Sequence, residues 1–258
     1  MKLKFNKMGW RFRKRLFYIS FIILIILIIF GPKLYKIIFY PSCYNNRQDP
    51  NEEGIDCGGP CIPCSVKELK DIIIQTPEPT ILVYPDETMD LIGIIKNPNE
   101  NYGLKYIEYK FILYGGNREK FEKEGKTYIL PLESKYIIES GLQVPQFEII
   151  KKEFKVFYKK EDWQKLETES PKITLLNYEI KDKEFDAEII NENLIDYPSV
   201  GLIFIFKDEY EEILGTFKTI AYDLKAGERR KISYYNLPPL LGKPYKVILY
   251  PEVNIFEL

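Results

Sequence analysis

A long apolar run constrains what this chain can fold into more than any other feature. Residues Leu16–Phe30 contain no charged side chain and one polar one, Ser20. A membrane-spanning helix needs about 20 residues, and the run reaches that length when the following residues, up to position 38, are included. The sequence therefore predicts one transmembrane helix over residues 16–38.

The charges on either side of this run predict its orientation. Residues 1–15 carry seven basic side chains and no acidic one, whereas only Lys33 and Lys36 follow closely. Basic residues are retained on the cytoplasmic side of a membrane helix. Residues 1–15 are therefore predicted to form a cytoplasmic tail, and residues from about 40 onward to lie outside the cell membrane. The alternative, a cleaved signal peptide, lacks a small-residue cleavage site after the run.

The charge and residue composition of the chain exclude several classes of function. Residues 1–40 hold nine of the 37 basic residues and none of the 38 acidic ones, which leaves residues 41–258 with a net charge of −10. An acidic surface disfavours nucleic acid and anionic lipid as partners. Without histidine the chain cannot form Ser-His-Asp or Cys-His catalytic sets, and it has no glycine-rich nucleotide-binding loop. We expect a protein that is not an enzyme and uses no cofactor.

All four cysteines fall within a short polar segment, residues 41–66. Cys43, Cys57, Cys61 and Cys64 lie in a stretch that has too few apolar residues for a core and needs cross-links. Outside the cytoplasm four cysteines most simply form two disulfides, and three pairings are open. Two other interpretations are a zinc site of four thiolates and a redox-active Cys61-x2-Cys64 pair.

Oxygen-bearing side chains in the same segment raise a further hypothesis. Asp49, Asn51, Glu53 and Asp56 place four oxygen donors within eight residues, a density that can hold calcium. Their spacing does not match an EF-hand loop, so a solvated acidic loop is the favoured interpretation. No metal site is predicted, and the four residues are kept as weak calcium candidates.

The run NEEGIDCGGPCIPC at residues 51–64, with Cys43 upstream, resembles the DCGG-x-C-x-x-C module of exported proteins. It is especially similar to a module that follows a single N-terminal span in membrane proteins of small-genome prokaryotes. The usual form has glycine where this chain has Asn46, and asparagine tolerates the left-handed backbone that glycine permits. The resemblance implies an exported setting and no particular function.

From Ile72 onward the apolar residues alternate with period two, which is typical of β-strands. Turn signals separate short strands at regular intervals, which favours antiparallel sandwiches. In Val200–Lys207 both faces are apolar, as in a central strand. The sequence predicts a mainly β protein with two tandem immunoglobulin-like sandwiches, over residues 70–166 and 172–258.

The two predicted sandwiches look like one unit used twice. Four matched pairs support this: residues 94–99 with 188–193, 111–115 with 204–208, 126–127 with 218–219, and 130–133 with 224–227. The offset stays between 92 and 94. A repeated order at one offset indicates a duplicated domain.

The run Phe111-Ile112-Leu113-Tyr114-Gly115, with a looser counterpart at residues 204–208, is similar to the FxLYD group of immunoglobulin-like extracellular domains. The resemblance covers roughly residues 70–258. It implies a seven-stranded sandwich and a cell-surface setting, and it supplies no catalytic residue.

These features predict a single-pass membrane protein whose sandwiches serve protein interaction, adhesion, or the assembly of an envelope or secretion complex. One alternative is a metal-binding or redox protein centred on the four cysteines. Another is carbohydrate binding through Tyr234, Tyr235 and Tyr245, whose rings offer a stacking surface and a hydroxyl. A protein partner is expected, but the sequence specifies neither its identity nor the oligomeric state.

Overall fold

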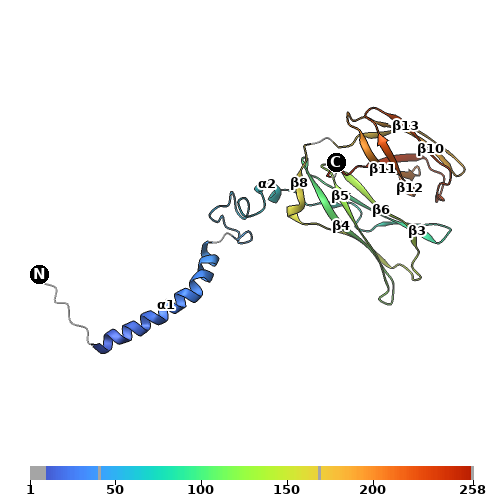
Figure 1. The fold of residues 1–258 in the computed structure, drawn as a ribbon. Coiled ribbons are helices and arrows are strands. Elements are labelled where there is room, and N and C mark those ends of the chain that lie inside the picture. Colours follow the sequence, from blue (N-terminus) through green and yellow to red (C-terminus); the bar gives the residue numbers. More distant parts are fainter. Residues whose placement is uncertain (1–9, 40–41, 168–169, 257–258) are drawn as a thin grey trace. The chain divides into compact units, whose positions relative to one another are not determined.

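The computed structural model describes residues 10–39, 42–167 and 170–256 of the chain (Figure 1). The chain divides into two compact units, Met1–Glu68 and Leu69–Leu258. The first unit contains helix α1, Trp10–Phe39, and the short helix α2, Cys64–Lys67. The strands of the described residues all lie in the second unit. The prediction of a mainly β protein with one N-terminal apolar helix is confirmed.

Helix α1 is the one stretch of described residues that is long and apolar enough to cross a membrane. Its apolar part, Arg13–Tyr35, has a mean hydropathy of 2.4, and protein buries none of it, as expected for side chains that face lipid. The helix continues through Pro32. Because α1 begins at Trp10, part of the predicted tail 1–15 is helical, while residues 1–9 lie outside the described residues.

Two disulfides cross-link the segment that follows α1. Cys43 is bonded to Cys61, and Cys57 to Cys64. The structure thus selects one of the three pairings that the sequence left open. With both disulfides formed, no described cysteine is free.

Left-handed backbone angles explain why several residues of this segment are small or are asparagine. Gly58 and Gly59 have positive φ, and a Cβ on Gly59 would collide with the carbonyl oxygen of Asn51. Asn46 has a φ of 56°, which confirms that asparagine there adopts the conformation that glycine usually supplies. The tight turn between the half-cystines therefore depends on these backbone conformations.

The second unit consists of antiparallel strands, β1 to β14, with one 3-10 turn, η1. The strands of its first half are β1 (Ile73–Ile74), β2 (Thr80–Val83), β3 (Thr88–Lys96), β4 (Tyr102–Tyr114), β5 (Lys120–Ile129), β6 (Ser134–Gln143), β7 (Lys151–Phe157) and, after η1 (Lys160–Asp162), β8 (Trp163–Lys165). Those of its second half are β9 (Ile173–Lys181), β10 (Glu184–Asn191), β11 (Tyr197–Lys207), β12 (Ile213–Leu224), β13 (Arg229–Tyr234) and β14 (Lys246–Glu252).

The two halves share one pattern of strand pairing. In the first, β3 pairs with β2 and β6, and β4 pairs with β5 and β7. In the second, β10 pairs with β9 and β13, and β11 pairs with β12 and β14. Strands β2 to β7 thus correspond in order to β9 to β14, and each half is a β-sandwich. The boundary predicted between residues 166 and 172 stays a prediction, and residues 168–169 lie outside the described residues.

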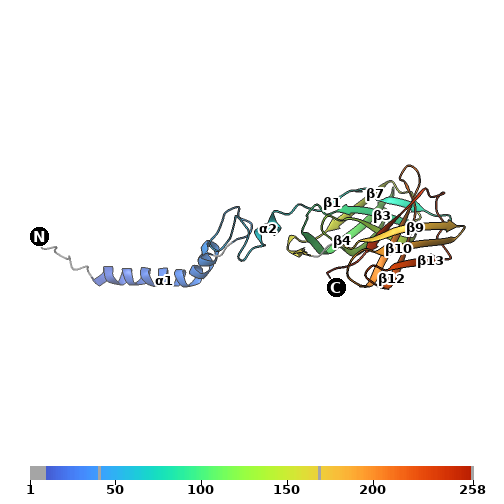
Figure 2. The same cartoon turned by 90° about the horizontal axis from the view of Figure 1, so that it is seen from above.

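The two sandwiches lie side by side within residues 69–258 (Figure 2). We call the sheet of β1, β2, β3 and β6 the first inner sheet, and the sheet of β11, β12 and β14 the second inner sheet, because their side chains meet in one buried cluster. The sheet of β4, β5, β7 and β8 is then the first outer sheet, and that of β9, β10 and β13 the second outer sheet.

Strand β11 shows how this arrangement follows from the sequence. Its side chains Leu202, Phe204 and Phe206 fill the core of the second sandwich. Ile203 and Ile205, on the opposite face, join the cluster between the two inner sheets. Both faces of the strand are therefore buried, and the apolar character of residues 200–207 has two separate causes. The sequence predicted a central strand, but not a second packing surface.

A corner of each sandwich is built around an equivalent asparagine. The side-chain amide of Asn97 donates to the carbonyl oxygens of Tyr102 and Leu130, at 2.6 and 2.8 Å. That of Asn191 donates to those of Ile195 and Lys225, at 2.9 and 3.0 Å. Leu130 is therefore equivalent to Lys225, and the predicted match of residues 130–133 with 224–227 is wrong by one position. A bulge between Phe206 and Lys207 shifts the register of β11 and β12.

Candidate functional site

The second unit has two distinct ends. The chain enters it beside the corner of the first sandwich, where Lys70 and Asn99 exchange hydrogen bonds of 3.0 and 2.9 Å. The last described residues return to the same end, because Phe256 packs against Tyr128 with ring centroids 6.3 Å apart. We call this the entry end. The opposite, distal end is formed by six connections: 84–87, 115–119, 144–150, 182–183, 208–212 and 235–245.

An apolar cluster joins the two inner sheets between these ends. It consists of side chains with little or no exposed surface, bordered by partly buried rings and isoleucines. The buried members are Leu82, Tyr84, Ile92, Ile138, Ile203 and Ile205. Burying apolar surface from two sheets stabilises their contact at about 25 cal/mol per Å². The sandwiches are therefore held together by the same force that forms their cores.

A buried carboxylate forms a hydrogen bond across this contact near the distal end. Asp90 on β3 accepts hydrogen bonds from the hydroxyls of Tyr84 and Thr216, both at 2.9 Å. Thr216 belongs to β12, so its hydrogen bond to Asp90 joins the two sandwiches. Burial, and next the nearby charge of Asp90, raise the pKa of Tyr84 above its usual value. The tyrosine remains a hydrogen-bond donor at any physiological pH.

A buried ammonium group forms an ion pair across the contact near the entry end. Lys135 on β6 is 1% exposed, and its Nζ lies 3.3 Å from Glu252 on β14 and 3.7 Å from the ring centroid of Tyr128. The Nζ has a charge partner but no hydrogen bond of good geometry. Nearby, the Tyr250 hydroxyl bonds to Glu133, and burial followed by that carboxylate raises the tyrosine pKa. Lys135 thus places a buried charge, with one carboxylate partner, at the contact between the sandwiches.

Exposed tyrosine rings distinguish the distal end of the second sandwich. Tyr210, Tyr235 and Tyr245 are 77, 74 and 75% exposed. Tyr210 and Tyr245 line a hollow of about 310 Å³ together with Pro244 and Lys243. Rings left in water on a scaffold otherwise rich in buried apolar groups are available for contact with another molecule.

A larger hollow of about 630 Å³ adjoins the same end. Its lining includes prolines and leucines from the connection between β13 and β14, with Asp86 from the first sandwich and Asp182 from the second. The prolines and leucines are Leu237, Pro238, Pro239, Leu240 and Pro244, and Ile180 adds a further apolar side chain. Hydrogen bonds from Thr88 hold the pKa of Asp86 below its usual value, so this carboxyl is ionised at neutral pH.

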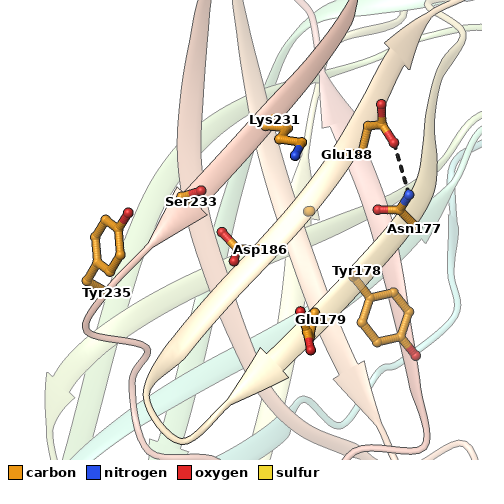
Figure 3. A pocket seen from close by; sticks show the side chains of 9 residues that line it. Asn177, Tyr178, Glu179, Asp186, Glu188, Lys231, Ser233 and Tyr235 are labelled. Carbon is orange, nitrogen blue, oxygen red and sulfur yellow. Dashed lines mark hydrogen bonds between the residues drawn. The ribbon is translucent and has the colours of Figure 1, made fainter.

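The exposed face of the second outer sheet carries a shallow depression (Figure 3). Figure 3 shows the rings of Tyr178 and Tyr235 on opposite sides, with Glu179 and Asp186 between them. Asp186 and Glu179 are direct cross-strand neighbours, a like-charge pair that costs stability. The depression has a volume of about 630 Å³, and most of the residues that line it are polar or charged.

The structure separates the three tyrosines that the sequence grouped as a glycan patch. The ring of Tyr234 packs on Phe217 with centroids 4.2 Å apart, so one of its faces belongs to the core. Tyr235 and Tyr245 are exposed, but Tyr235 borders the depression whereas Tyr245 lines the smaller hollow. Tyr178 and Tyr210, which the sequence did not single out, complete these two places. Only the folded loops bring them there.

Two of the four calcium candidates accept hydrogen bonds within the cross-linked segment. Asp49 accepts hydrogen bonds from the backbone of Ser42 and the side chain of Asn45, both at 2.8 Å. Asp56 is buried and accepts hydrogen bonds from the backbone N–H groups of Asn45 and Asn46, at 2.9 and 3.0 Å. Both carboxylates thereby stabilise the loop.

The remaining two calcium candidates, Asn51 and Glu53, are exposed. Among described cysteine and carboxylate side chains, a different group has ligand atoms within 4.8 Å of one another: Cys43, Glu52 and Cys61. The calcium interpretation stays a prediction.

Comparison with known proteins leaves the family open. No family model matches the chain, and no curated protein matches it. Among solved structures, the calcium binding domain CBD12 of CALX1.1 is 8% identical, with a TM-score of 0.24 over 65% of this chain and 76% of that one. Red sea bream transglutaminase is 8% identical, with a TM-score of 0.19 over 62% of this chain and 27% of that one. Similarity this low supports no statement about function.

Proposed function

We propose that this is a single-pass membrane protein, not an enzyme, that displays residues 69–258 outside the cell membrane and binds a protein through their distal end. One observation carries the proposal. The chain enters the β-unit at one end, and its last described residue lies at that end. Among the described residues of the unit, the three most exposed tyrosines and two hollows lined in part by proline lie at the other end. A membrane-tethered unit built this way keeps its most adhesive surface far from its point of attachment.

The chemistry of the distal end favours a protein as the partner. Prolines and leucines line the larger hollow, and tyrosine is enriched at the centre of protein interfaces because it combines a large apolar ring with a hydroxyl. The distal turns of both sandwiches contribute to this hollow through Asp86 and Asp182. The contact between the inner sheets therefore pre-organises the surface, which lowers the entropy cost of binding.

The disulfides and the apolar helix support the proposed location. Disulfides persist outside the cytoplasm, and the two observed here cross-link the segment directly after α1. The resemblances to the DCGG module and to FxLYD domains imply the same setting. We propose that residues 1–15 are cytoplasmic, by the charge rule.

Site-specific photo-crosslinking in intact cells tests the function. A photoreactive amino acid replaces Tyr210, Tyr235 or, as the control, Tyr106, which is 56% exposed but lies in the entry half of β4. We expect one discrete protein adduct from positions 210 and 235, and none from position 106. The adduct from position 210 should disappear when Tyr245→Ala is added. Equal adducts from all three positions, or none, would overturn the proposed binding end.

A second candidate function is carbohydrate binding at the depression in Figure 3. The observation that favours it is the pair of rings, Tyr178 and Tyr235, flanking exposed carboxylates. Envelope glycans added to the purified protein should then shift the NMR signals of residues on β9, β10 and β13. Signals that stay unchanged at millimolar glycan would eliminate this candidate.

A further inference from the structure

A buried carboxylate lies against one of the two disulfides. Glu52 is 8% exposed. Its Oε2 accepts hydrogen bonds from the backbone N–H groups of Asp49 and Asp56, at 2.9 and 3.2 Å. Its Oε1 lies 3.1 Å from the Sγ of Cys61. The two backbone bonds fix the carboxylate, so Oε1 is held toward the sulfur atoms.

This oxygen has no hydrogen-bond donor. Cys61 is bonded to Cys43, and a disulfide sulfur carries no proton to donate. In the part of the chain that the structure describes, Oε1 has no other partner. A buried carboxylate oxygen without a donor costs free energy, so its position needs an explanation beyond loop stability, for which Oε2 is sufficient.

The atoms around Oε1 form a set of metal ligands. The two sulfurs and the carboxylate oxygen lie within 4.8 Å of one another. Thiolates at about 2.3 Å and a carboxylate oxygen at about 2.0 Å are the bonds that zinc makes in proteins. Three protein ligands leave a fourth tetrahedral position open for water. Neither Cys57 nor Cys64 belongs to this set.

We propose that Cys43, Cys61 and Glu52 form a zinc site when their disulfide is reduced. A dithiol supplies two electrons and two protons: it becomes a cyclic disulfide, and the Cys43–Cys61 bond is replaced by two thiols. Zinc then binds both sulfurs as thiolates and releases the two protons to solvent. The Oε1 atom of Glu52, which lies 3.1 Å from the Sγ of Cys61, completes the protein ligands.

The two states keep the segment folded in different ways. In the oxidised state a covalent bond joins residues 43 and 61. In the reduced state the metal joins the same residues and adds residue 52, and metal binding contributes directly to the stability of small cross-linked segments. The site therefore converts a structural cross-link into a metal cross-link in the segment that follows α1 in the sequence.

The test uses the full chain in detergent, before and after anaerobic reduction by a dithiol that is then removed. Zinc is titrated against a chromophoric chelator, with the variant Glu52→Gln beside the matched control Glu53→Gln, whose side chain is adjacent but exposed. We expect one zinc per reduced chain, none per oxidised chain, and an affinity at least about tenfold lower in Glu52→Gln. Glu53→Gln should bind as the wild type does.

Alkylation of the zinc-loaded wild type identifies the ligands without relying on any variant. Mass spectrometry should find Cys43 and Cys61 protected, and Cys57 and Cys64 either alkylated or still bonded to each other. Protection of all four thiols would mean a four-thiolate site and overturn the proposal. So would equal affinity in Glu52→Gln and Glu53→Gln, or no zinc in the reduced chain.

Discussion

The inner sheet of each sandwich has the same strand pairing as the outer sheet of the other sandwich. The inner sheets are covered by protein, whereas the outer sheets face water. Ile203 of the second inner sheet is equivalent to Lys110 of the first outer sheet, because β11 and β4 align at Phe204 and Phe111. Ile92 of the first inner sheet is likewise equivalent to Asp186 of the second outer sheet. In each pair the isoleucine is buried between the sandwiches and the charged residue faces water.

This contrast shows that the side chains on the face of a sheet, and not its strand pairing, decide how a sandwich associates. The backbone pairing is the same in both halves, so pairing alone would permit either face to pack against a neighbour. At the two pairs of positions compared above, only the inner face carries an apolar side chain. The first outer sheet instead carries ion pairs, among them Lys110 with Glu124, and Glu153 with Lys151 and Lys155. Charged outer faces oppose stacking because packing them would remove charges from water.

Moving a charge from the outer to the inner position should have the largest effect. Ile203→Lys places at the contact the residue found at its outer equivalent, and Ile203 is 1% exposed. An unpaired charge there should cost about 4 kcal/mol of unfolding free energy. Denaturant unfolding of the full chain, followed by tryptophan fluorescence, measures it. The reverse change, Lys110→Ile, should leave the midpoint close to that of the wild type; equal losses in both variants would contradict the comparison.

Removing one partner of the buried ion pair should have an intermediate effect. Glu252→Ala leaves the ammonium of Lys135 buried without a charge partner, and we expect a loss of about 2 kcal/mol, less than for a fully buried pair because Glu252 is partly exposed. Lys135→Met keeps the volume and removes the charge, so its stability should stay within about 1 kcal/mol of the wild type. The same unfolding experiment ranks them. A greater loss in Lys135→Met would show that the charge itself holds the sandwiches together.

Neutralising a carboxylate of the outer face should have the smallest effect. Hydrogen bonds from Lys151 and Lys155 lower the pKa of Glu153 from 4.5 to about 2. Because the pKa is lower in the folded state, Glu153 stabilises the fold above pH 4.5, and this contribution is lost as the pH falls toward 2. Melting temperatures from pH 6 to pH 2 should therefore decline slightly less in Glu153→Gln, and salt should reduce the difference. Identical pH profiles would mean that these ion pairs contribute nothing.

Local patterns in the sequence predicted the elements well. Period-two alternation indicated the strands, the apolar run indicated α1, and the clustered cysteines indicated two disulfides. Each depends on residues close together in the chain. The pairing of Cys43 with Cys61 was not predictable, because it depends on how a polar loop is shaped by Glu52 and Asp56 through backbone hydrogen bonds.

The candidate binding surface was predictable only in part. The sequence singled out Tyr235 and Tyr245, which are exposed, but placed them with Tyr234, whose ring packs on Phe217. Adjacent residues of a strand point to opposite faces, so Tyr234 and Tyr235 do not act as one patch. Tyr210 lies far away in sequence and reaches the same hollow as Tyr245 through the hairpin between β11 and β12.

An apolar helix, a cross-linked polar segment and two copies of one strand order could be read from the chain, because periodicity, charge and cysteine spacing are local properties. The folded structure was needed to see that the two copies join through Ile203, Ile205 and their neighbours into one compact unit with an entry end and a distal end. Burial between two sheets depends on side chains more than a hundred residues apart, which no local pattern records. An alternating apolar pattern records that a face is covered, but not what covers it.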